Sequence, residues 1–403
     1  MANVSSSNGL EKRPKLHFPG FDEPYKQCRI GDIYAERSQR GASDMELLSV
    51  TMNDGVMPRS EIEGKDNSSE DKSNYKVVLT GDMVYNSMRM WQGANGISPC
   101  DGIVSPAYTV LMPKIPISNG YFAAFFKSPN LINEFRKNSQ GMTSDTWNLK
   151  YPQIETIKVC IPALSEQNRV ADMLRTLERR IAKQAQLVDN LKKYKRGLLS
   201  REFGQQENGD LNNRYVGKLK DYFHLSSGST PSSTNRAFYS GNIRWVSSGE
   251  LKPKYLCETS QHISSEAVSS CNLREYPANT LLVAMYGLEA AGVRGTASIL
   301  SVPATISQAC MAIQQTGEID IEYLYYWYIY NGQWIGIRIA QGTKQQNLST
   351  DTLGNLRIHA PSCSKQKKVC KLLSQIDYLI EKEGQKIDLL SSAKRGLLQQ
   401  LFI

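Results

Sequence analysis

The fold of this chain is decided by residues 158–203, which read KVCIPALSEQNRVADMLRTLERRIAKQAQLVDNLKKYKRGLLSREF. The pattern returns at residues 357–402 as RIHAPSCSKQKKVCKLLSQIDYLIEKEGQKIDLLSSAKRGLLQQLF, without a gap and at a fixed offset of 199 (361 − 162). Both copies contain the run KRGLL, at 195–199 and at 394–398. A repeat of this length indicates that one structural module is present twice.

Each copy predicts one long helix that pairs through an apolar seam. Apolar residues alternate at spacings of four and three, which is typical of a coiled coil. At 1.5 Å per residue, a segment of about 39 residues forms a helix roughly 58 Å long, too long to bury its seam inside one small domain. The other copy is the simplest partner, and the seam residues are Leu174, Leu177, Ile181, Val188 and Leu191 in the first helix and Leu373, Ile376, Ile380, Ile387 and Leu390 in the second.

Polar residues interrupt both seams and suggest a register. They are Gln184 and Lys195 in the first helix, and Glu383 and Lys394 in the second. An antiparallel pair centred near 189–190 and 388–389 would place Lys195 opposite Glu383 and Gln184 opposite Lys394, and such polar pairs commonly fix orientation. The alternative is that each helix packs on its own globular half.

A serine lies near the predicted start of each long helix. Ser165 and Ser364 follow Pro162 and Pro361, and a serine hydroxyl can accept a hydrogen bond from a free first-turn N–H. We therefore predict that these serines are the N-caps.

The regions before the helices repeat only faintly, as at Val84/Val283 and Gly96/Gly295. Alternating apolar residues with Gly, Asn and Asp punctuation predict mixed, β-rich domains, so the fold class is α+β with a pseudo-two-fold internal repeat. The predicted parts are an N-terminal arm at 1–24, a globular domain at 25–160, a helix at 161–204, a linker at 205–214, a second domain at 215–360 and a second helix at 361–403.

Composition restricts the class of protein. A net charge of +9 and a pI near 9.0 fit a polyanionic partner, most often nucleic acid. Eight scattered cysteines without a Cys-x-x-Cys pair predict reduced thiols and neither a zinc site nor a disulfide framework. No apolar run reaches the roughly 18 residues of a membrane span, and the polar start lacks a signal core, so we expect a cytoplasmic protein.

The loops of both domains carry side chains that reach phosphates and base edges. For any one of them the simpler interpretation is a solvated loop residue or, for Trp91 and Trp245, a core aromatic. Asn148-Leu149 and Asn347-Leu348 recur at the shared offset and are interpreted as structural. As a set, the candidates favour DNA binding: Tyr85, Asn86, Arg89, Trp91 and Gln92 in the first domain, and Thr230, Trp245, Ser247, Ser248, Tyr286, Lys344, Gln345 and Gln346 in the second.

Catalytic motifs are missing from the sequence. It contains no Gly-x-x-x-x-Gly-Lys-Ser/Thr phosphate loop, no amino-methyltransferase motif and no glycine-rich methyl-donor loop. We expect a recognition and scaffold protein without catalytic or metal-binding residues, for which partners supply the chemistry.

Taken together, these residues resemble the specificity subunit of type I restriction–modification enzymes across essentially the whole chain. The resemblance rests on HFPGF at 17–21, GDMVYNSMRMWQG at 81–93, the SGSTPS to SSGEL series at 227–251, LVAMYG at 282–287, QGTKQQNLS at 341–349 and the doubled helices. The second copy departs at its helix start, where a lysine precedes Gln366 in place of the acidic residue found before Gln167.

The resemblance implies two target recognition domains that each read one half of a bipartite, asymmetric double-stranded DNA site. It also implies that the two helices form an antiparallel spacer that docks two adenine methyltransferase subunits, with ATP-dependent restriction and translocase subunits joining for cleavage. S-adenosylmethionine, ATP and magnesium would belong to those partners, and this chain would hold no cofactor. The alternative is a cytoplasmic coiled-coil scaffold that joins two proteins without touching DNA. A third possibility is a self-contained restriction–methylation enzyme, and the missing methyl-donor and amino-methylation motifs count against it.

Overall fold

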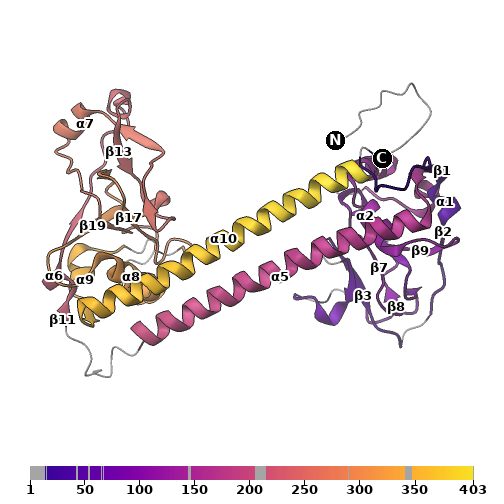
Figure 1. Cartoon of the computed structure of the whole chain (residues 1–403), viewed down its shortest axis with the longest axis horizontal. Coiled ribbons are helices and arrows are strands. Elements are labelled where there is room, and N and C mark those ends of the chain that lie inside the picture. The colour runs from indigo at the N-terminus through magenta and orange to yellow at the C-terminus, as the bar shows by residue number, and fades with distance from the viewer. Residues whose placement is uncertain are drawn as a thin grey trace. The chain divides into compact units, whose positions relative to one another are not determined.

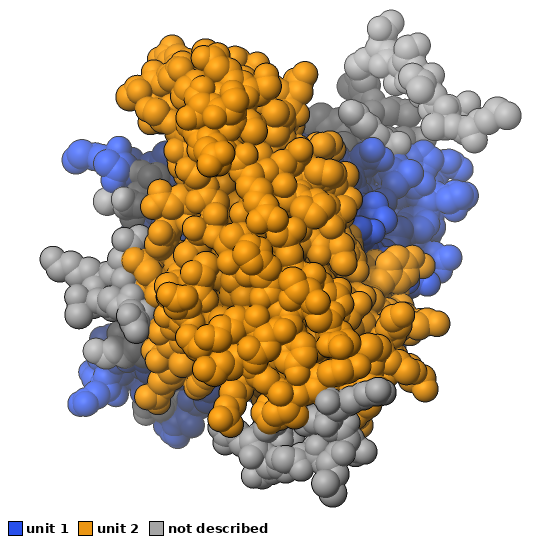
Figure 2. Space-filling view, turned by 90° about the vertical axis from the view of Figure 1, so that its left-hand side faces the viewer, with its two compact units in different colours: residues 1–186, 384–403 blue, residues 187–383 orange. Residues whose placement is uncertain are grey.

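The computed structural model divides the chain into two compact units, shown in Figure 2. Unit 1 comprises residues 1–186 and 384–403, and unit 2 comprises residues 187–383. The structure describes residues 14, 16–41, 44–52, 55–64, 66, 68–143, 147–204, 215–288, 290–340 and 347–402. Among these described residues, no helix is both long and apolar enough to cross a membrane.

Unit 1 is built around small antiparallel sheets. The largest has the order β2 (Tyr34–Glu36), β9 (Tyr108–Pro113), β6 (Met83–Asn86) and β7 (Asn95–Ile97). Two-stranded sheets pair β3 (Leu48–Thr51) with β4 (Gly55–Pro58), β5 (Lys76–Val78) with β8 (Gly102–Val104), and β1 (Lys26–Arg29) with β10 (Lys158–Ile161). The helices are α1 (Ile30–Ile33), α2 (Asn119–Phe125), α3 (Pro129–Asn138) and α4 (Tyr151–Ile154).

Unit 2 has a five-stranded sheet in the order β12 (Phe223–Ser227), β19 (Cys310–Gln315), β16 (Leu281–Ala284), β17 (Ala297–Leu300) and β14 (Tyr255–Leu256). A second sheet orders β15 (Gln261–Ile263), β13 (Ile243–Val246) and β18 (Thr305–Ile306), and β11 (Tyr215–Lys218) pairs with β20 (Arg357–Ala360). The helices are α6 (Leu219–Tyr222), α7 (Ser265–Ser270), α8 (Ile321–Trp334) and α9 (Thr350–Gly354). Within this unit, α7 and β13 lie away from the long helices, whereas α8 lies beside α10 (Figure 1).

Two long helices complete the units: α5 (Leu164–Phe203) and α10 (Cys363–Leu401). The start of α5 and the end of α10 belong to unit 1, and the end of α5 and the start of α10 belong to unit 2. The predicted α+β class and the two long helices are confirmed. All ten predicted seam residues are buried or half-buried, as a packed seam requires.

The predicted N-caps are wrong by two residues. Helix α5 begins at Leu164 and α10 at Cys363, so Ser165 and Ser364 already lie inside the first turn. The repeated glutamine organises each start instead, because the side chain of Gln167 donates to the Pro162 carbonyl at 3.0 Å and that of Gln366 donates to the Pro361 carbonyl at 2.8 Å.

The same glutamines join the long helices to the globular domains. The Gln167 side-chain oxygen accepts from the Ser118 N–H at 3.0 Å, and that of Gln366 accepts from the Asp320 N–H at 2.8 Å. Ser118 and Asp320 are the N-cap residues of α2 and α8. Both glutamines are almost fully buried, and each satisfies at least two backbone groups.

The ends of the long helices explain why KRGLL is repeated. At the end of α10, Leu397 and Leu398 pack on the apolar core of unit 1, and Phe402 lies 5.2 Å from the Tyr121 ring. At the end of α5, Leu198 and Leu199 pack in the core of unit 2. Phe203 there lies 5.2 Å from the ring of Tyr323. Each globular core thus contains the start of one long helix and the end of the other.

Two repeated ion pairs define the helix register in each unit. Lys195 donates to Asp377 at 2.5 Å in unit 2, and Lys394 donates to Glu178 at 2.7 Å in unit 1. The second pair is the first displaced by the repeat offset of 199 (394 − 195 and 377 − 178). Since rising numbers on α5 meet falling numbers on α10, with Leu199 and Leu373 in one core, the helices are antiparallel within each unit.

The predicted pairs Lys195–Glu383 and Gln184–Lys394 are therefore wrong. Lys195 contacts Asp377, which directly follows the seam residue Ile376. Ile376 lies one heptad before Glu383 (383 − 376). A seven-residue slip leaves every seam position facing another seam position, so heptad periodicity cannot choose between the two registers. The register is set instead by the helix ends that pack in the globular cores and by the ion pairs of Asp377 and Glu178 beside the seam.

The register can be tested by charge reversal. We expect Lys195→Glu to lower the free energy of unfolding of unit 2 by about 2 kcal/mol, because it places two carboxylates together at a half-buried position. Asp377→Lys should restore most of the loss, whereas Glu383→Lys should not. Urea unfolding measures the effect, and Lys192→Glu, at an exposed neighbouring site, is the control. Rescue by Glu383→Lys alone would overturn the register.

Candidate nucleic-acid interface

In unit 1, an aromatic and cationic surface forms where two loops meet. The turn η2 (Met90–Gln92) follows β6, and the Trp91 ring lies 5.3 Å from the Trp147 ring in an edge-to-face arrangement. The Arg136 guanidinium, at the end of α3, lies 5.4 Å from the centre of the Trp147 ring. Arg89, Gln92 and Arg136 are exposed around these rings. Guanidinium groups beside flat aromatic faces suit phosphates and bases.

A repeated backbone contact anchors these loops. The N–H of Leu149 donates to the Ser87 carbonyl at 2.9 Å, and that of Leu348 donates to the Met285 carbonyl at 2.8 Å. Both leucine side chains are buried. The repeated Asn-Leu pairs are therefore structural, as the sequence predicted, and each leucine is held against the segment that follows β6 or β16.

The predicted DNA-binding residues of unit 1 fall into different environments. Tyr85 is fully buried in the central strand β6, so its predicted DNA contact is wrong. The Asn86 side chain accepts from the Met88 N–H at 3.0 Å and shapes the turn. Trp91 is half-buried and donates its indole N–H to the Met88 carbonyl, whereas Arg89 and Gln92 project into solvent.

In unit 2, Trp245 is a core residue. It is 6% exposed, lies in an apolar cluster with Ile263, and donates its N–H to the Ser229 carbonyl at 3.3 Å. The alternative interpretation of this tryptophan is thus correct and its predicted DNA contact is wrong. β13 is the central strand of its sheet, and the Trp245 ring lies on the face that packs against this cluster, 5.9 Å from the Tyr239 ring.

The other predicted residues of unit 2 remain at or near the surface. Thr230 is exposed and its hydroxyl accepts from the Gln308 N–H at 3.2 Å. Ser247 and Ser248 are half-buried at the turn η5 (Ser248–Glu250), and Tyr286 is half-buried against the main core. Lys344, Gln345 and Gln346 lie outside the described residues.

Glu250 holds the Ser247 turn together. Its carboxylate accepts from the N–H and hydroxyl of Ser247, both at 2.8 Å, and from the Ser260 N–H at 2.6 Å. Burial disfavours the charged carboxylate, but the hydrogen bonds from Ser260 and Ser247 outweigh burial and lower the pKa of Glu250. The loop that presents Ser247 therefore depends on an ionised glutamate.

A pH dependence follows from this lowered pKa. Because the pKa is lower in the folded state, the contribution of Glu250 to stability is fully present above its unfolded pKa and is lost as the pH falls through the folded value. We expect Glu250→Gln to reduce the unfolding free energy by about 1–2 kcal/mol at pH 7 and by progressively less in acid. Thermal unfolding of both proteins from pH 7 to pH 3 tests this, with exposed Glu258→Gln as the control. A difference that does not change with pH would contradict it.

Two residues of the surface in unit 1 were missed by the sequence reasoning. Trp147 and Arg136 lie far from Trp91 in sequence, and only the fold brings Trp147 to Trp91 and Arg136 to Trp147. Trp147 directly precedes the repeated Asn148-Leu149 anchor. A residue such as Trp147, which is not repeated but lies next to a repeated anchor, is therefore a sequence signal for a recognition loop.

An acidic cluster in unit 2 has a structural explanation. Oxygen and sulfur atoms of Asp320, Glu322 and Cys370 lie within 4.8 Å of one another, as metal ligands can. However, Asp320 caps the N–H of Glu322 at 2.8 Å, and Glu322 is paired with Lys254. Burial raises the pKa of the Cys370 thiol and disfavours the thiolate that metals bind.

Known proteins with similar sequences share one description. Residues 213–391 match the family model of the type I restriction modification DNA specificity domain. The chain is 29% identical over 192 residues to the MjaIX type I restriction enzyme specificity subunit of Methanocaldococcus jannaschii, over 47% of this chain and 43% of the relative. It is 23% identical over 248 residues to the EcoR124I/EcoR124II specificity subunit of Escherichia coli, over 60% of each. The chain thus aligns with about half the length of these two relatives.

Solved structures with the same fold cover nearly the whole chain. The type I restriction–modification S subunit from M. genitalium superposes with a TM-score of 0.60 at 14% identity, over 97% of this chain and 99% of that one. The HsdS subunit from Thermoanaerobacter tengcongensis superposes with a TM-score of 0.52 at 14% identity, over 96% and 97%. A chain from a study of complex assembly in the type I R-M system gives 0.61 at 15% identity, over 96% and 98%.

Proposed function

We propose that this chain is a type I restriction–modification specificity subunit and that it selects the DNA sequence on which such a complex acts. The match of residues 213–391 to the specificity domain model, the similar relatives and the shared fold support this proposal. One observation carries the proposal. The two units share a frame of repeated joints, at Gln167/Gln366 and Leu149/Leu348, yet present different side chains on the loops that this frame holds. A common frame with different loops is what reading two unlike half-sites requires.

Binding would combine two kinds of contact. Exposed arginines such as Arg89 and Arg136 in unit 1 supply affinity by neutralising phosphates, a term that falls with salt. Discrimination comes from side chains that reach base edges, for which Gln92 and Thr230 are exposed candidates. The site would be bipartite and asymmetric because the two sets of loops differ.

The long helices would hold the partners. Their outer faces carry exposed apolar side chains outside the seam, among them Leu187 and Tyr194 on α5 and Leu372 and Leu379 on α10. Each pair is seven residues apart, a spacing that suits packing against another helix. We propose that two adenine methyltransferase subunits dock on the helices and that restriction subunits join through them. The partners would bind S-adenosylmethionine, ATP and magnesium and flip the target base out of the duplex.

Base-resolution mapping of adenine methylation tests the whole proposal. In a cell that expresses this chain with its methyltransferase, methylated adenines should lie in one split motif with an unread spacer. Deleting the chain should abolish that methylation. A continuous motif, or unchanged methylation after deletion, would contradict the proposal and favour a protein scaffold that does not contact DNA.

The surface of unit 1 can be tested by the dependence of DNA affinity on salt. We expect Arg89→Ala or Arg136→Ala to weaken binding of the methyltransferase complex to its site. Each should also reduce the slope of log affinity against log salt by about 0.9 for every phosphate that the variant no longer neutralises. Lys137→Ala is the matched control, because Lys137 is exposed on the same helix but paired with Glu134 at 2.6 Å. Equal effects of all three substitutions would assign the affinity to net charge rather than to this surface.

A further inference from the structure

Unit 1 contains an open groove beside its long helices. It has a volume of about 790 Å³ and is lined by small and apolar residues of α2, including Ala123 and Ala124, and by Leu174 and Ile181 of α5. Glu178 and Lys394, the ion pair of this unit, also line it. Grooves lined by small residues let another chain approach closely.

The internal repeat shows which residues occupy the same place in unit 2. Helices α2 and α8 begin equivalently, because Gln167 and Gln366 bind the N–H of their respective N-caps. The third residue of each, Tyr121 or Tyr323, packs on the phenylalanine that ends a long helix. By this alignment, Ala123 and Ala124 correspond to Tyr325 and Tyr326.

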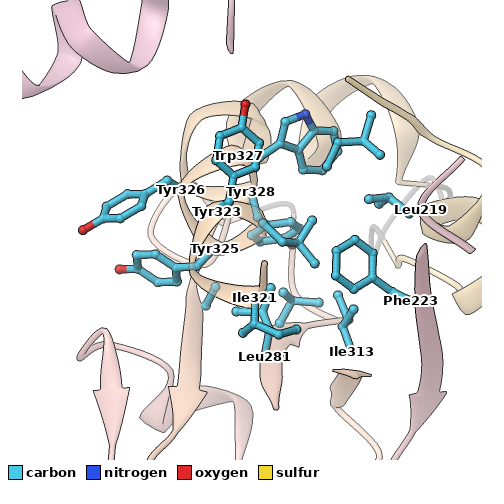
Figure 3. Close-up of a cluster of buried hydrophobic side chains, with 14 of the residues drawn as sticks. Leu219, Phe223, Leu281, Ile313, Ile321, Tyr323, Tyr325, Tyr326, Trp327 and Tyr328 are labelled. Carbon is cyan, nitrogen blue, oxygen red and sulfur yellow. The ribbon is translucent and has the colours of Figure 1, made fainter. Parts of the chain in front are cut away.

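In unit 2 these tyrosines fill the position. Figure 3 shows the rings of Tyr325 and Tyr326 on the side of α8 opposite Leu219 and Phe223. The Tyr326 hydroxyl donates to Asp377 at 2.8 Å, and Asp377 is the counterpart of Glu178. Lys254 donates to the Tyr326 hydroxyl at 2.9 Å and lies 4.5 Å from the centre of its ring.

Unit 2 therefore fills with its own side chains what unit 1 leaves open. A hollow beside α10 in unit 2 has a volume of about 510 Å³ and is lined by Glu322, Ser374 and Tyr378, among others. A tyrosine backed by a lysine satisfies the carboxylate beside the seam in unit 2. In unit 1, Ala123 and Ala124 occupy the positions of the two tyrosines, and they line the groove together with the equivalent carboxylate of Glu178.

From this difference we infer that the groove of unit 1 receives a segment of a methyltransferase subunit that inserts an aromatic side chain backed by a lysine or arginine. The inference rests on the proposed function for the identity of the partner. The chemistry of the occupant is taken from unit 2, where Tyr326 and Lys254 meet the equivalent acid. The two halves would thus bind the two methyltransferase subunits differently. Unit 1 would accept an aromatic side chain of its partner, whereas in unit 2 Tyr326 of the chain itself already occupies that position.

The test fills the groove as unit 2 does. The full chain carrying Ala124→Tyr is mixed with its methyltransferase subunit, and native mass spectrometry and titration measure stoichiometry and affinity. We expect the wild type to bind two subunits and the variant to bind one of them at least tenfold more weakly. Ala182→Arg, at an exposed residue on the groove, should have the same effect without disturbing the fold.

Met142→Tyr is the matched control, because Met142 is fully exposed in unit 1 and does not line the groove. Two subunits bound with wild-type affinity by both Ala124→Tyr and Ala182→Arg would overturn the inference and leave the proposed function standing. A wild-type chain that binds no methyltransferase subunit would overturn both.

Discussion

The structure depends on the insertion of each long helix's end into a globular core. Phe402 packs against Tyr121 and Phe125, and Phe203 packs against Tyr323, so each core is completed by a segment from the far end of a helix. Burying a phenylalanine contributes about 1.5–3 kcal/mol, and the leucines before it add to this. Since the start of one long helix and the end of the other are anchored in the same core, the register between α5 and α10 in each unit is fixed as well.

This constraint explains which residues the two halves share. The glutamine joints, the Asn-Leu anchors, the ion pairs beside the seam and the terminal phenylalanines all recur, because each positions a helix or a loop. The loops attached to this frame share little, and Trp91 and Trp147 have no repeated counterpart. Because the frame is repeated within one chain and the loops differ, the same backbone arrangement presents two different surfaces.

The repeat also serves as an internal comparison. Where Tyr326, Lys254 and Asp377 form a network in unit 2, the alanines of α2 leave Glu178 and Lys394 beside a groove. A buried carboxylate is costly unless hydrogen bonds satisfy it, and unit 2 provides them within the chain. The more exposed Glu178 of unit 1 tolerates the open position until a partner contacts it.

The sequence by itself determined the duplication, the two long helices and the α+β class, because periodicity and a gapless repeat are local properties of the chain. It also identified Arg89 and Gln92 as accessible residues and Leu149 and Leu348 as structural ones. Only the tertiary structure decided the register, since a shift of one heptad leaves the seam unchanged. It alone buried Tyr85 and Trp245 and brought Arg136 and Trp147 to Trp91, because strand pairing and loop packing join residues far apart in sequence.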